Sequence, residues 1–175
     1  VEIITCMYNE EFLAPFFLKH YGWADKITVL FGEDSTDKTE SILKENGKVD
    51  IIPFAMPHGM DDELKARMIT DVYSGSEADW VLICDADEFA FVSKKDLEEI
   101  KEEFDIARVA LFNVYRHISE GDLDPSKTIK EQRRYGYLSP EYVKPLLARA
   151  GLNVAWGPGH HGIVGMTNLY PKVFL

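Results

Sequence analysis

The stretch WVLICDADEFAF, residues 80–91, joins a short apolar run to three acidic side chains. A short apolar run bounded by polar residues is typical of a buried strand in a parallel sheet. Ligands of open α/β sheets bind at the carboxyl ends of the strands, where carboxylates spaced one residue apart can hold a hard divalent cation. The stretch therefore predicts either a cation site at this edge or a plain acidic turn.

Strand-like and helix-like segments alternate through the first half of the chain. The expected strands are 1–7, 26–31, 49–54 and 80–84, and the expected helices are 12–21, 61–73 and a helix capped by Ser35 or Thr36 that runs to about residue 46. Pro53 predicts an edge position for the third strand. This alternation predicts an α/β fold with a mostly parallel central sheet between helices.

The remaining segments are less regular. We expect a loop over 56–60, a helix over 94–104, a strand over 108–115 and a long loop over 116–136. Residues 142–150 fit either a helix or a strand, residues 156–162 form a glycine-rich loop, and 170–175 is a last strand. No linker divides the chain, so we expect one domain over residues 1–175.

The composition excludes several function classes. The 175 residues carry a formal charge of −11, which argues against a nucleic-acid partner or an anionic membrane surface. Cys6 and Cys84 lie in predicted strands, so we expect buried, reduced thiols. No membrane span or signal peptide is visible, which favours a cytoplasmic location. Because the sequence opens on a strand at Val1, it is also compatible with a piece of a longer protein that lacks C-terminal parts.

Common nucleotide-binding and hydrolase motifs are missing. The first strand-to-helix turn, TCMYNEEF, contains no glycine, so a GxGxxG dinucleotide site is unsupported. GxxxxGK[ST] and GxSxG are absent, and Phe89 stands where a haloacid-dehalogenase phosphatase would have Thr or Val.

Three motifs follow one another in a recognisable order. They are NEE at 9–11, EDSTDKT at 33–39 and DADEF at 85–89. Together they resemble glycosyltransferase family 2, and in particular a branch that contains DADEF. The resemblance covers residues 1 to about 115. It implies a GT-A-type fold, a three-layer α/β/α sandwich, and a hexosyltransferase-like enzyme that takes a UDP- or GDP-sugar donor and a glycan or other acceptor.

The resemblance also implies a divided role for the acidic motif. Asp87 would bind Mn²⁺ or Mg²⁺ at the donor diphosphate, and Asp85 would contact the ribose or the metal. A Lewis-acid cation suits this chemistry, because the leaving diphosphate gains negative charge as the glycosyl bond breaks. Glu88 faces either the acceptor or solvent.

Further nucleotide contacts are implied less specifically. Either Glu33 or Asp34 would bind the base or ribose, because the second loop departs from the family pattern at this point. Asn9 and Glu10 are candidates at the same sheet edge, with ordinary turn residues as the alternative. Arg67 stands where related enzymes have an Arg-Asn pair, or it is an exposed helix arginine. Asp37 and Thr39 are better explained as loop and cap residues.

The glycine-rich loop contains two adjacent histidines. Metal-dependent members of the fold supply a late histidine as a cation ligand, and neighbouring side chains of an extended segment diverge. We therefore expect His161 rather than His160 to reach the ion, with a simple surface loop as the alternative. Lys144 and Arg149 resemble basic residues that offset the diphosphate charge, or they are solvated helix positions.

No residue is identified as the catalytic base. Four acidic residues fall in the poorly patterned region, namely Glu120, Asp122, Asp124 and Glu131. The resemblance to family 2 thus implies a metal-dependent, inverting glycosyltransferase. The alternative is a non-catalytic module of the same fold that binds nucleotide-sugars or carbohydrate. A sugar-nucleotide pyrophosphorylase lacks support, because its glycine-rich first loop is missing.

Overall fold

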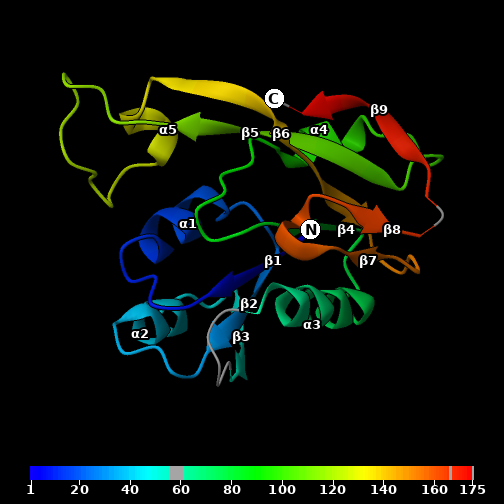
Figure 1. The fold of residues 1–175 in the computed structure, drawn as a ribbon, viewed down its shortest axis with the longest axis horizontal. Helices are drawn as coiled ribbons and strands as arrows, with labels where there is room; N and C mark the ends of the chain where they lie inside the picture. The colour runs from blue at the N-terminus through cyan, green and yellow to red at the C-terminus, as the bar shows by residue number, and fades with distance from the viewer. Residues whose placement is uncertain (56–60, 166, 175) are drawn as a thin grey trace.

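The computed structural model describes residues 1–55, 61–165 and 167–174, and in these residues a seven-stranded sheet carries helices on both faces (Figure 1). The strand order is β3-β2-β1-β4-β6-β5-β9, and β7 and β8 form a small second sheet. The strands are β1 (Glu2–Met7), β2 (Lys26–Gly32), β3 (Val49–Phe54), β4 (Trp80–Ile83), β5 (Ile106–Val114), β6 (Gly136–Arg149), β7 (Ala155–Trp156), β8 (Ile163–Val164) and β9 (Leu169–Phe174). The helices are α1 (Ala14–His20), α2 (Thr39–Lys44), α3 (Asp62–Ser74), α4 (Lys94–Glu98), α5 (Ile129–Gln132) and the 3₁₀ turn η1 (Pro158–His160).

The predicted mostly parallel sheet is confirmed. β1 pairs with β2 and β4, and β2 pairs with β3, all in parallel register. β6 is antiparallel to both β4 and β5, whereas β9 is parallel to β5. β3 is an edge strand, as Pro53 predicts, because a proline cannot donate to a neighbouring strand.

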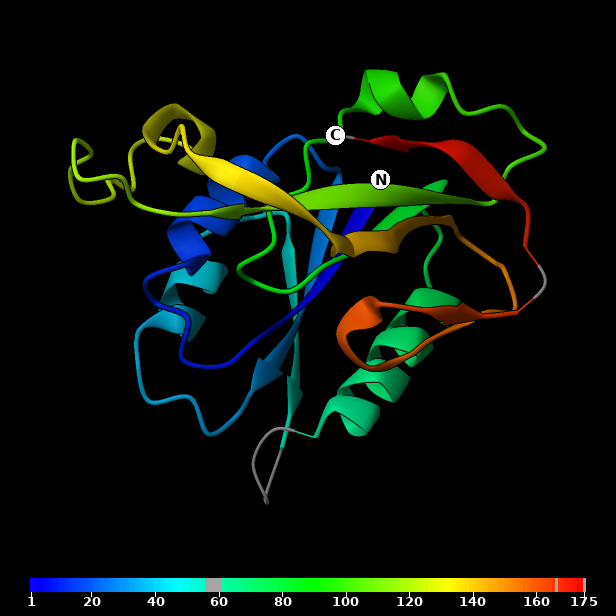
Figure 2. The same ribbon diagram turned by 45° about the horizontal axis from the view of Figure 1, so that its top comes forward.

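The side chains of the central strands alternate between two hydrophobic clusters, which gives the sheet its two covered faces. Ile3 and Met7 of β1 pack in the cluster that includes Phe17 of α1, while Ile4 packs in the cluster that includes Ile69 of α3. Figure 2 shows α1 and α2 on one side of the parallel strands and α3 on the other. The predicted three-layer α/β/α arrangement is therefore confirmed.

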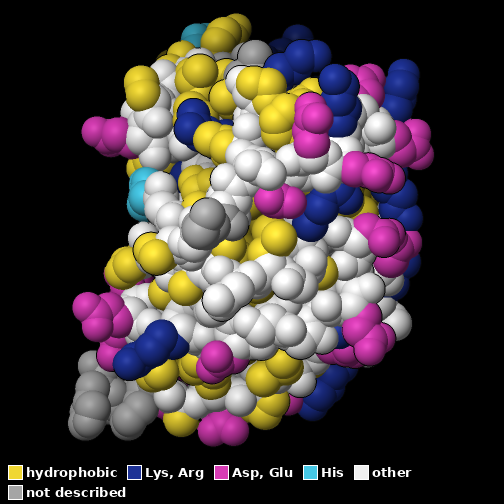
Figure 3. All heavy atoms as spheres, turned by 90° about the vertical axis from the view of Figure 1, so that its right-hand side faces the viewer, with side chains coloured by type: hydrophobic (Ala, Val, Ile, Leu, Met, Phe, Trp, Pro, Cys, Tyr) yellow, Lys and Arg dark blue, Asp and Glu magenta, His cyan; other side chains and the backbone are white. Residues whose placement is uncertain are grey.

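Cys6 and Cys84 are buried and free, as predicted. No helix in the described part of the chain is long and apolar enough to cross a lipid bilayer. On the face shown in Figure 3, basic and acidic side chains are interspersed with hydrophobic ones.

Two helix predictions need correction. The expected helix over 94–104 ends at Glu98, although Ser93 and Asp96 form a capping box at its start. Its continuation would place Glu102 four residues after Glu98 and Glu103 four residues after Glu99, and like charges at this spacing destabilise a helix. The α2 helix is not capped by Ser35 or Thr36, since it begins at Thr39, whose N–H donates to Asp37 Oδ1.

In the second half of the chain, the structure shows which of the predicted helices, strands and loops are formed. Residues 142–149 belong to strand β6, which ends at Arg149 and lies between β4 and β5. The long loop over 116–136 contains the short helix α5, and the glycine-rich loop contains η1. The predicted loop over 56–60 and the last residue of the predicted strand 170–175 lie outside the described residues.

Tyr21 at the end of α1 fixes the loop that follows β4. Its hydroxyl donates to the Glu88 carbonyl at 2.8 Å and accepts from the Ala90 N–H at 2.9 Å. Tyr21 is fully buried, so water cannot replace these two bonds. The DADEF loop is therefore attached to the first helix through its backbone.

We expect Tyr21→Phe to lower the free energy of unfolding by about 1–3 kcal/mol, because it leaves a buried carbonyl and a buried N–H without a partner. Urea unfolding followed by circular dichroism measures this loss. Tyr170→Phe is the matched control, since Tyr170 is also buried and its hydroxyl has no hydrogen bond to the described residues. Equal losses in the two variants would contradict the role of Tyr21.

Candidate active site

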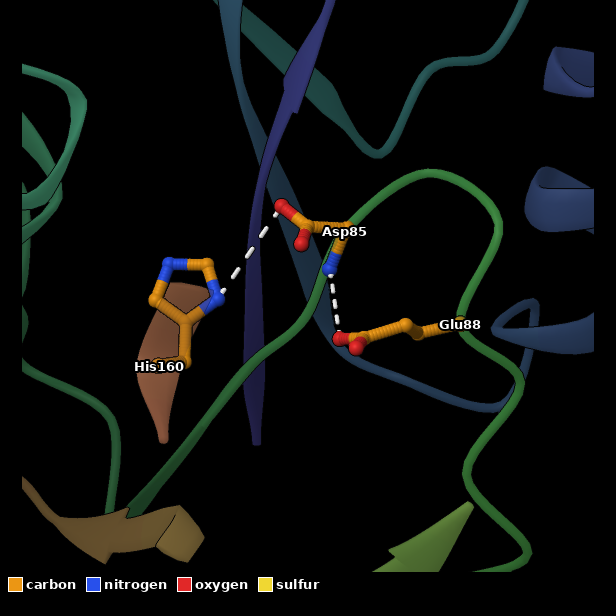
Figure 4. Close-up of side chains that lie close together, drawn as sticks. All are labelled: Asp85, Glu88 and His160. Carbon is orange, nitrogen blue, oxygen red and sulfur yellow. Dashed lines mark hydrogen bonds and ion pairs between the residues drawn. The ribbon is translucent and has the colours of Figure 1, made fainter. Parts of the chain in front are cut away.

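Two acidic side chains and a histidine meet beyond the carboxyl end of β4 (Figure 4). Asp85 and Glu88 come from the loop after β4, and His160 comes from η1. One potential ligand atom of each residue lies within 4.8 Å of the others. Residues 75 positions apart in the sequence thus converge on one point, as expected for a ligand site at the carboxyl edge of a parallel sheet.

Two buried lysines compensate the acidic charges. Lys65 of α3 places Nζ 3.0 Å from Asp85 Oδ1, and Lys144 of β6 places Nζ 2.5 Å from Glu88 Oε1. The Asp85 N–H donates to Glu88 Oε2 at 2.9 Å, so both Glu88 oxygens are engaged. Glu88 is therefore held as a link between the loop and β6.

A bulge directs Lys144 into the site. The register of β6 against β5 shifts between the pair Lys144–Val109 and the pair Leu147–Ala107. Pro145 lies in this shift, where a missing N–H does not interrupt the ladder. Bulges re-aim neighbouring side chains, and the Lys144 side chain here is only 4% exposed.

The charges around Asp85 favour its ionised form. Burial raises the pKa of the Asp85 carboxyl, but His160, Lys65 and Lys144 outweigh burial and hold the pKa below its usual value. Burial likewise raises the pKa of Glu88, and Lys144 offsets only part of this effect. Burial lowers the pKa of His160 to about 4, even though Asp85 acts in the opposite direction.

His160 is suited to bind a cation. Its side chain is fully buried, and neither ring nitrogen has a hydrogen-bond partner among the described residues. Nδ1 faces Asp85 Oδ1 at 4.0 Å, and Figure 4 shows the carboxylate pointing toward the ring. A neutral imidazole is a common metal ligand, and a carboxylate oxygen suits Mn²⁺ or Mg²⁺. Asp85 and His160 together therefore fit Mn²⁺ better than Mg²⁺, which prefers oxygen ligands alone.

The structure brings His160, not His161, to the acidic loop. His161 is exposed, and its Nδ1 lies 3.0 Å from the Glu141 carbonyl. The reason is the left-handed backbone of Gly159 (φ 62°) and His160 (φ 58°), which the expectation of an extended segment ignored. A side chain at Gly159 would also come within 2.9 Å of the His161 ring. The histidine beside Asp85 is thus the opposite of the one expected.

Asp87 stays outside the cluster of Asp85, Glu88 and His160. Its side chain is exposed and lines a pocket of about 490 Å³ together with Asp85 and Glu88. The family resemblance suggests Asp87 as the principal ligand of the ion. The potential ligand atoms that cluster here belong to other residues, because Asp87 lies outside the group of Asp85, Glu88 and His160.

Hydrogen bonds connect the NEE motif after β1 to the EDSTDKT motif after β2. Asn9 Oδ1 accepts from the Thr36 N–H at 2.8 Å, and the Glu10 N–H donates to Thr39 Oγ1 at 2.7 Å. The Glu11 N–H donates to Asp37 Oδ2 at 2.8 Å. Asp37 and Thr39 therefore have the structural roles expected of them, and the Asn9 side chain also has one.

The other proposed nucleotide contacts line the same edge without joining the cluster. Glu33 and Asp34 are exposed at the end of β2. Burial raises the pKa of Glu10, and the negative charges of Asp87 and Asp37 add to this effect. Glu10 thus lies close enough to the DADEF loop to share its electrostatic environment.

The basic residue of α3 that contacts the acidic loop is Lys65, whereas Arg67 remains a prediction for the nucleotide. Arg67 is exposed, whereas Lys65, two residues earlier, is buried against Asp85. Helical spacing could have suggested Lys65, because Lys65 shares a face with the buried residues Ile69 and Tyr73. On β6, Arg149 lies away from the site, with its guanidinium over the Trp80 ring and Nε donating to the Phe104 carbonyl.

Comparison with known proteins gives a fold and no closer relative. No protein-family model matches the sequence, and no curated protein matches it significantly. The structure is similar to that of TarS from S. aureus, a glycosyltransferase, with a TM-score of 0.56 and 14% identity over 99% of this chain and 35% of TarS. Residues 1–349 of TarS in complex with UDP give a TM-score of 0.52 and 17% identity, over 85% of this chain and 46% of that one.

The fold is that of GT-A-like glycosyltransferases. Strand β4 of this sheet leads into the DADEF loop, and the cluster of Asp85, Glu88 and His160 lies at the carboxyl end of β4. The chain spans less than half the length of the TarS chains that it matches.

We expect Lys144→Met to lower the free energy of unfolding by about 3–5 kcal/mol, because it leaves the buried Glu88 carboxylate without its cation. The double variant Lys144→Met/Glu88→Gln should recover most of this loss. Lys94→Met, which breaks an exposed pair with Asp25, is the control and should cost about 0.2–1 kcal/mol. Urea unfolding of the four proteins, including the parent, measures these differences. An equal loss in the single and double variants would rule out an unpaired charge as the cause.

Proposed function

We propose that the protein is a metal-dependent glycosyltransferase that transfers a sugar from a nucleoside-diphosphate donor to a glycan or other hydroxyl acceptor. The observation that carries this proposal is His160, a fully buried imidazole whose two nitrogens lack a hydrogen-bond partner in the described part of the chain. It lies beside the ionised Asp85 at the carboxyl edge of a GT-A-like sheet. The UDP complex of the TarS fragment supports UDP as the nucleotide. Inversion follows from the family 2 resemblance alone.

In this proposal Asp85 and His160 would hold a Mn²⁺ or Mg²⁺ ion. Such ions need few protein ligands, because phosphate oxygens and water complete their coordination. When bound, the ion would neutralise charge on the leaving diphosphate. Glu88 would act indirectly, by keeping Lys144 and the Asp85 backbone in position. Asn9, Glu10, Glu33, Asp34 and Arg67 remain proposed contacts for the nucleotide along the ends of β1 and β2 and on α3.

The residues of the chain supply the rest of the proposed chemistry. Lys65 and Lys144 place two positive charges at the edge where the diphosphate would leave, and pre-positioned charges stabilise such a group without reorganisation. The acceptor oxygen forms a bond to the anomeric carbon as the bond from that carbon to the diphosphate breaks. The diphosphate leaves with the electron pair, and the hydroxyl proton passes to a base or to water.

Saturating UDP with Mn²⁺, at about 100 times the Kd, should raise the melting temperature by about 5–10 °C, whereas UDP with a chelator should raise it less. The part of this melting-temperature shift that depends on Mn²⁺ should be absent in Asp85→Asn and in His160→Gln. The His160→Gln variant retains a polar side chain in the buried site. His161→Gln is the matched control and should behave like the parent. Loss of the shift in His161→Gln or Asp87→Asn, with His160→Gln unaffected, would place the ion elsewhere.

A second candidate function is a non-catalytic module that binds nucleotide-sugars or carbohydrate. Two observations favour it. The acids and lysines of the site already pair with each other, and the acidic residues considered as a base are engaged elsewhere. The Glu120 and Glu131 side chains accept backbone N–H groups, Asp122 pairs with Arg116, and Asp124 lies near Lys127. None of the four lines the 490 Å³ pocket.

Enzymatic turnover of a sugar nucleotide distinguishes the glycosyltransferase from the non-catalytic module. We expect slow Mn²⁺-dependent hydrolysis of at least one donor from a panel of UDP- and GDP-sugars, since glycosyltransferases can use water in place of their acceptor. Released nucleotide is measured by coupled assay, with Asp85→Asn as the inactive control. Tight binding of a sugar nucleotide by the full-length protein, with neither hydrolysis nor transfer to any glycan offered, would instead support the module.

A further inference from the structure

The 490 Å³ pocket lies on the side of the DADEF loop that faces β5, β6 and α5. Its walls include the aromatic side chains of Phe89, Phe91, Phe112 and Tyr142, and Asp85 and Asp87 also contribute to its lining. Neither His160 nor Lys65 lines it. The volume is typical of a small-molecule site, and aromatic walls suit a ligand with a ring-shaped or apolar body.

Arg133 gives the pocket a cation without an acidic partner. Among the described residues, no carboxylate lies within 4.0 Å of its guanidinium, and Nη1 donates to the Gln132 carbonyl at 3.1 Å. Its neighbour in the same region, Arg116, is by contrast paired with Asp122 at 2.8 Å. Glu120 is close enough for the charge of Arg133 to contribute to the lowered pKa of its carboxyl, but it forms no ion pair with Arg133. The half-buried guanidinium therefore keeps N–H donors for an anionic ligand.

The position of Arg133 is set by the short helix before it. Thr128 and Glu131 form a capping box at the start of α5, and Ile129 is buried in the pocket wall. The Arg133 N–H donates to the Ile129 carbonyl at 2.9 Å, which fixes the backbone of Arg133 at the end of the helix. The Arg133 side chain thus extends from a backbone position that the helix fixes at the pocket wall.

Asn113 adds a second donor that lacks an acceptor. It lies on β5 opposite Tyr137, and it lines the same pocket. Its Nδ2 is buried without a hydrogen-bond partner among the described residues. A buried donor without a partner is costly, and a ligand oxygen would remove this cost.

We propose that this pocket is the acceptor subsite, and that it takes an acceptor whose ring-shaped or apolar body carries a phosphate or carboxylate bound by Arg133. Asn113 donates to an oxygen of the same ligand. The inference rests on the proposed glycosyltransferase function, and it adds the chemical class of the acceptor. The acidic edge at Asp85 and Asp87 lies in the lining of the same pocket, so a hydroxyl of the bound acceptor faces the donor side.

Small aromatic anions test the pocket without a donor. Binding of phenyl phosphate, benzoate and the neutral phenyl β-D-glucopyranoside to the full chain is measured by ligand-observed NMR titration, with and without saturating UDP and Mn²⁺. We expect at least one anion to bind more tightly than the neutral glucoside, and to stay bound when UDP and Mn²⁺ are present. A preference for phenyl phosphate identifies a phosphate acceptor, and a preference for benzoate identifies a carboxylate.

Arg133→Gln should weaken binding of the preferred anion at least about tenfold, as expected for loss of a charged hydrogen bond. Arg134→Gln is the matched control, because Arg134 is exposed and does not line the pocket, and it should change affinity less than about twofold. Equal effects of the two variants, displacement of the anion by UDP and Mn²⁺, or tighter binding of the neutral glucoside would overturn the proposal.

The same measurements separate this inference from the proposed function. If Arg133→Gln loses the anion but retains the UDP and Mn²⁺ shift in melting temperature, both ideas stand. If the parent chain binds the anion through Arg133 and shows no response to UDP with Mn²⁺, the glycosyltransferase proposal fails while the anion pocket remains. If the nucleotide response is present and the anions bind independently of Arg133, only the acceptor inference fails.

Discussion

The site depends on the buried carboxylate of Glu88 and the half-buried carboxylate of Asp85, which lie beside two buried ammonium groups. An ionised side chain removed from water is costly unless a partner of opposite charge lies within hydrogen-bond distance. Asp85 and Glu88 meet this condition through Lys65 and Lys144, which come from α3 and β6. The DADEF loop can therefore adopt this conformation only when a helix on one face of the sheet and an antiparallel strand beside β4 have both docked. Formation of the site is coupled in this way to formation of the whole sheet.

The sequence predicts well what depends on neighbouring residues. The apolar runs of β1, β2 and β4 and the helical periodicity of α3 specify a parallel sheet whose acidic strand end carries the site. The sequence predicts poorly the features that depend on the backbone conformation of one or two residues. The left-handed conformation of Gly159 and His160 decides which histidine turns inward, and the bulge at Pro145 decides that Lys144 turns inward instead of toward solvent. Neither feature has a periodic pattern that could reveal it.

The NEE and EDSTDKT motifs also have a structural role in this chain that needs no ligand. The NEE and STDKT motifs led to the family resemblance, yet several of their polar groups bind each other. Asn9 and Glu11 use side-chain and backbone atoms to hold the loop after β2. Such contacts are a reason for residues to occur together that is independent of any ligand. They also fix the relative position of two strand ends, and this leaves Glu33 and Asp34 exposed at the edge where the proposed nucleotide would lie.

The DADEF loop lies between the candidate cation site and the 490 Å³ pocket, and the proposed reaction would need ligands on both sides of this loop. On one side, Asp85 faces the unpaired imidazole of His160, and on the other, the loop lines the pocket that contains Arg133. The backbone is fixed at both ends, by the Cys84 N–H on the Ile4 carbonyl at 3.2 Å and by the Ala90 N–H on the Tyr21 hydroxyl. A loop held at both ends keeps the distance between its two sides nearly constant. The alignment of donor and acceptor would then be set by the fold before either ligand binds, and this preorganisation is what lowers the barrier of a bimolecular transfer.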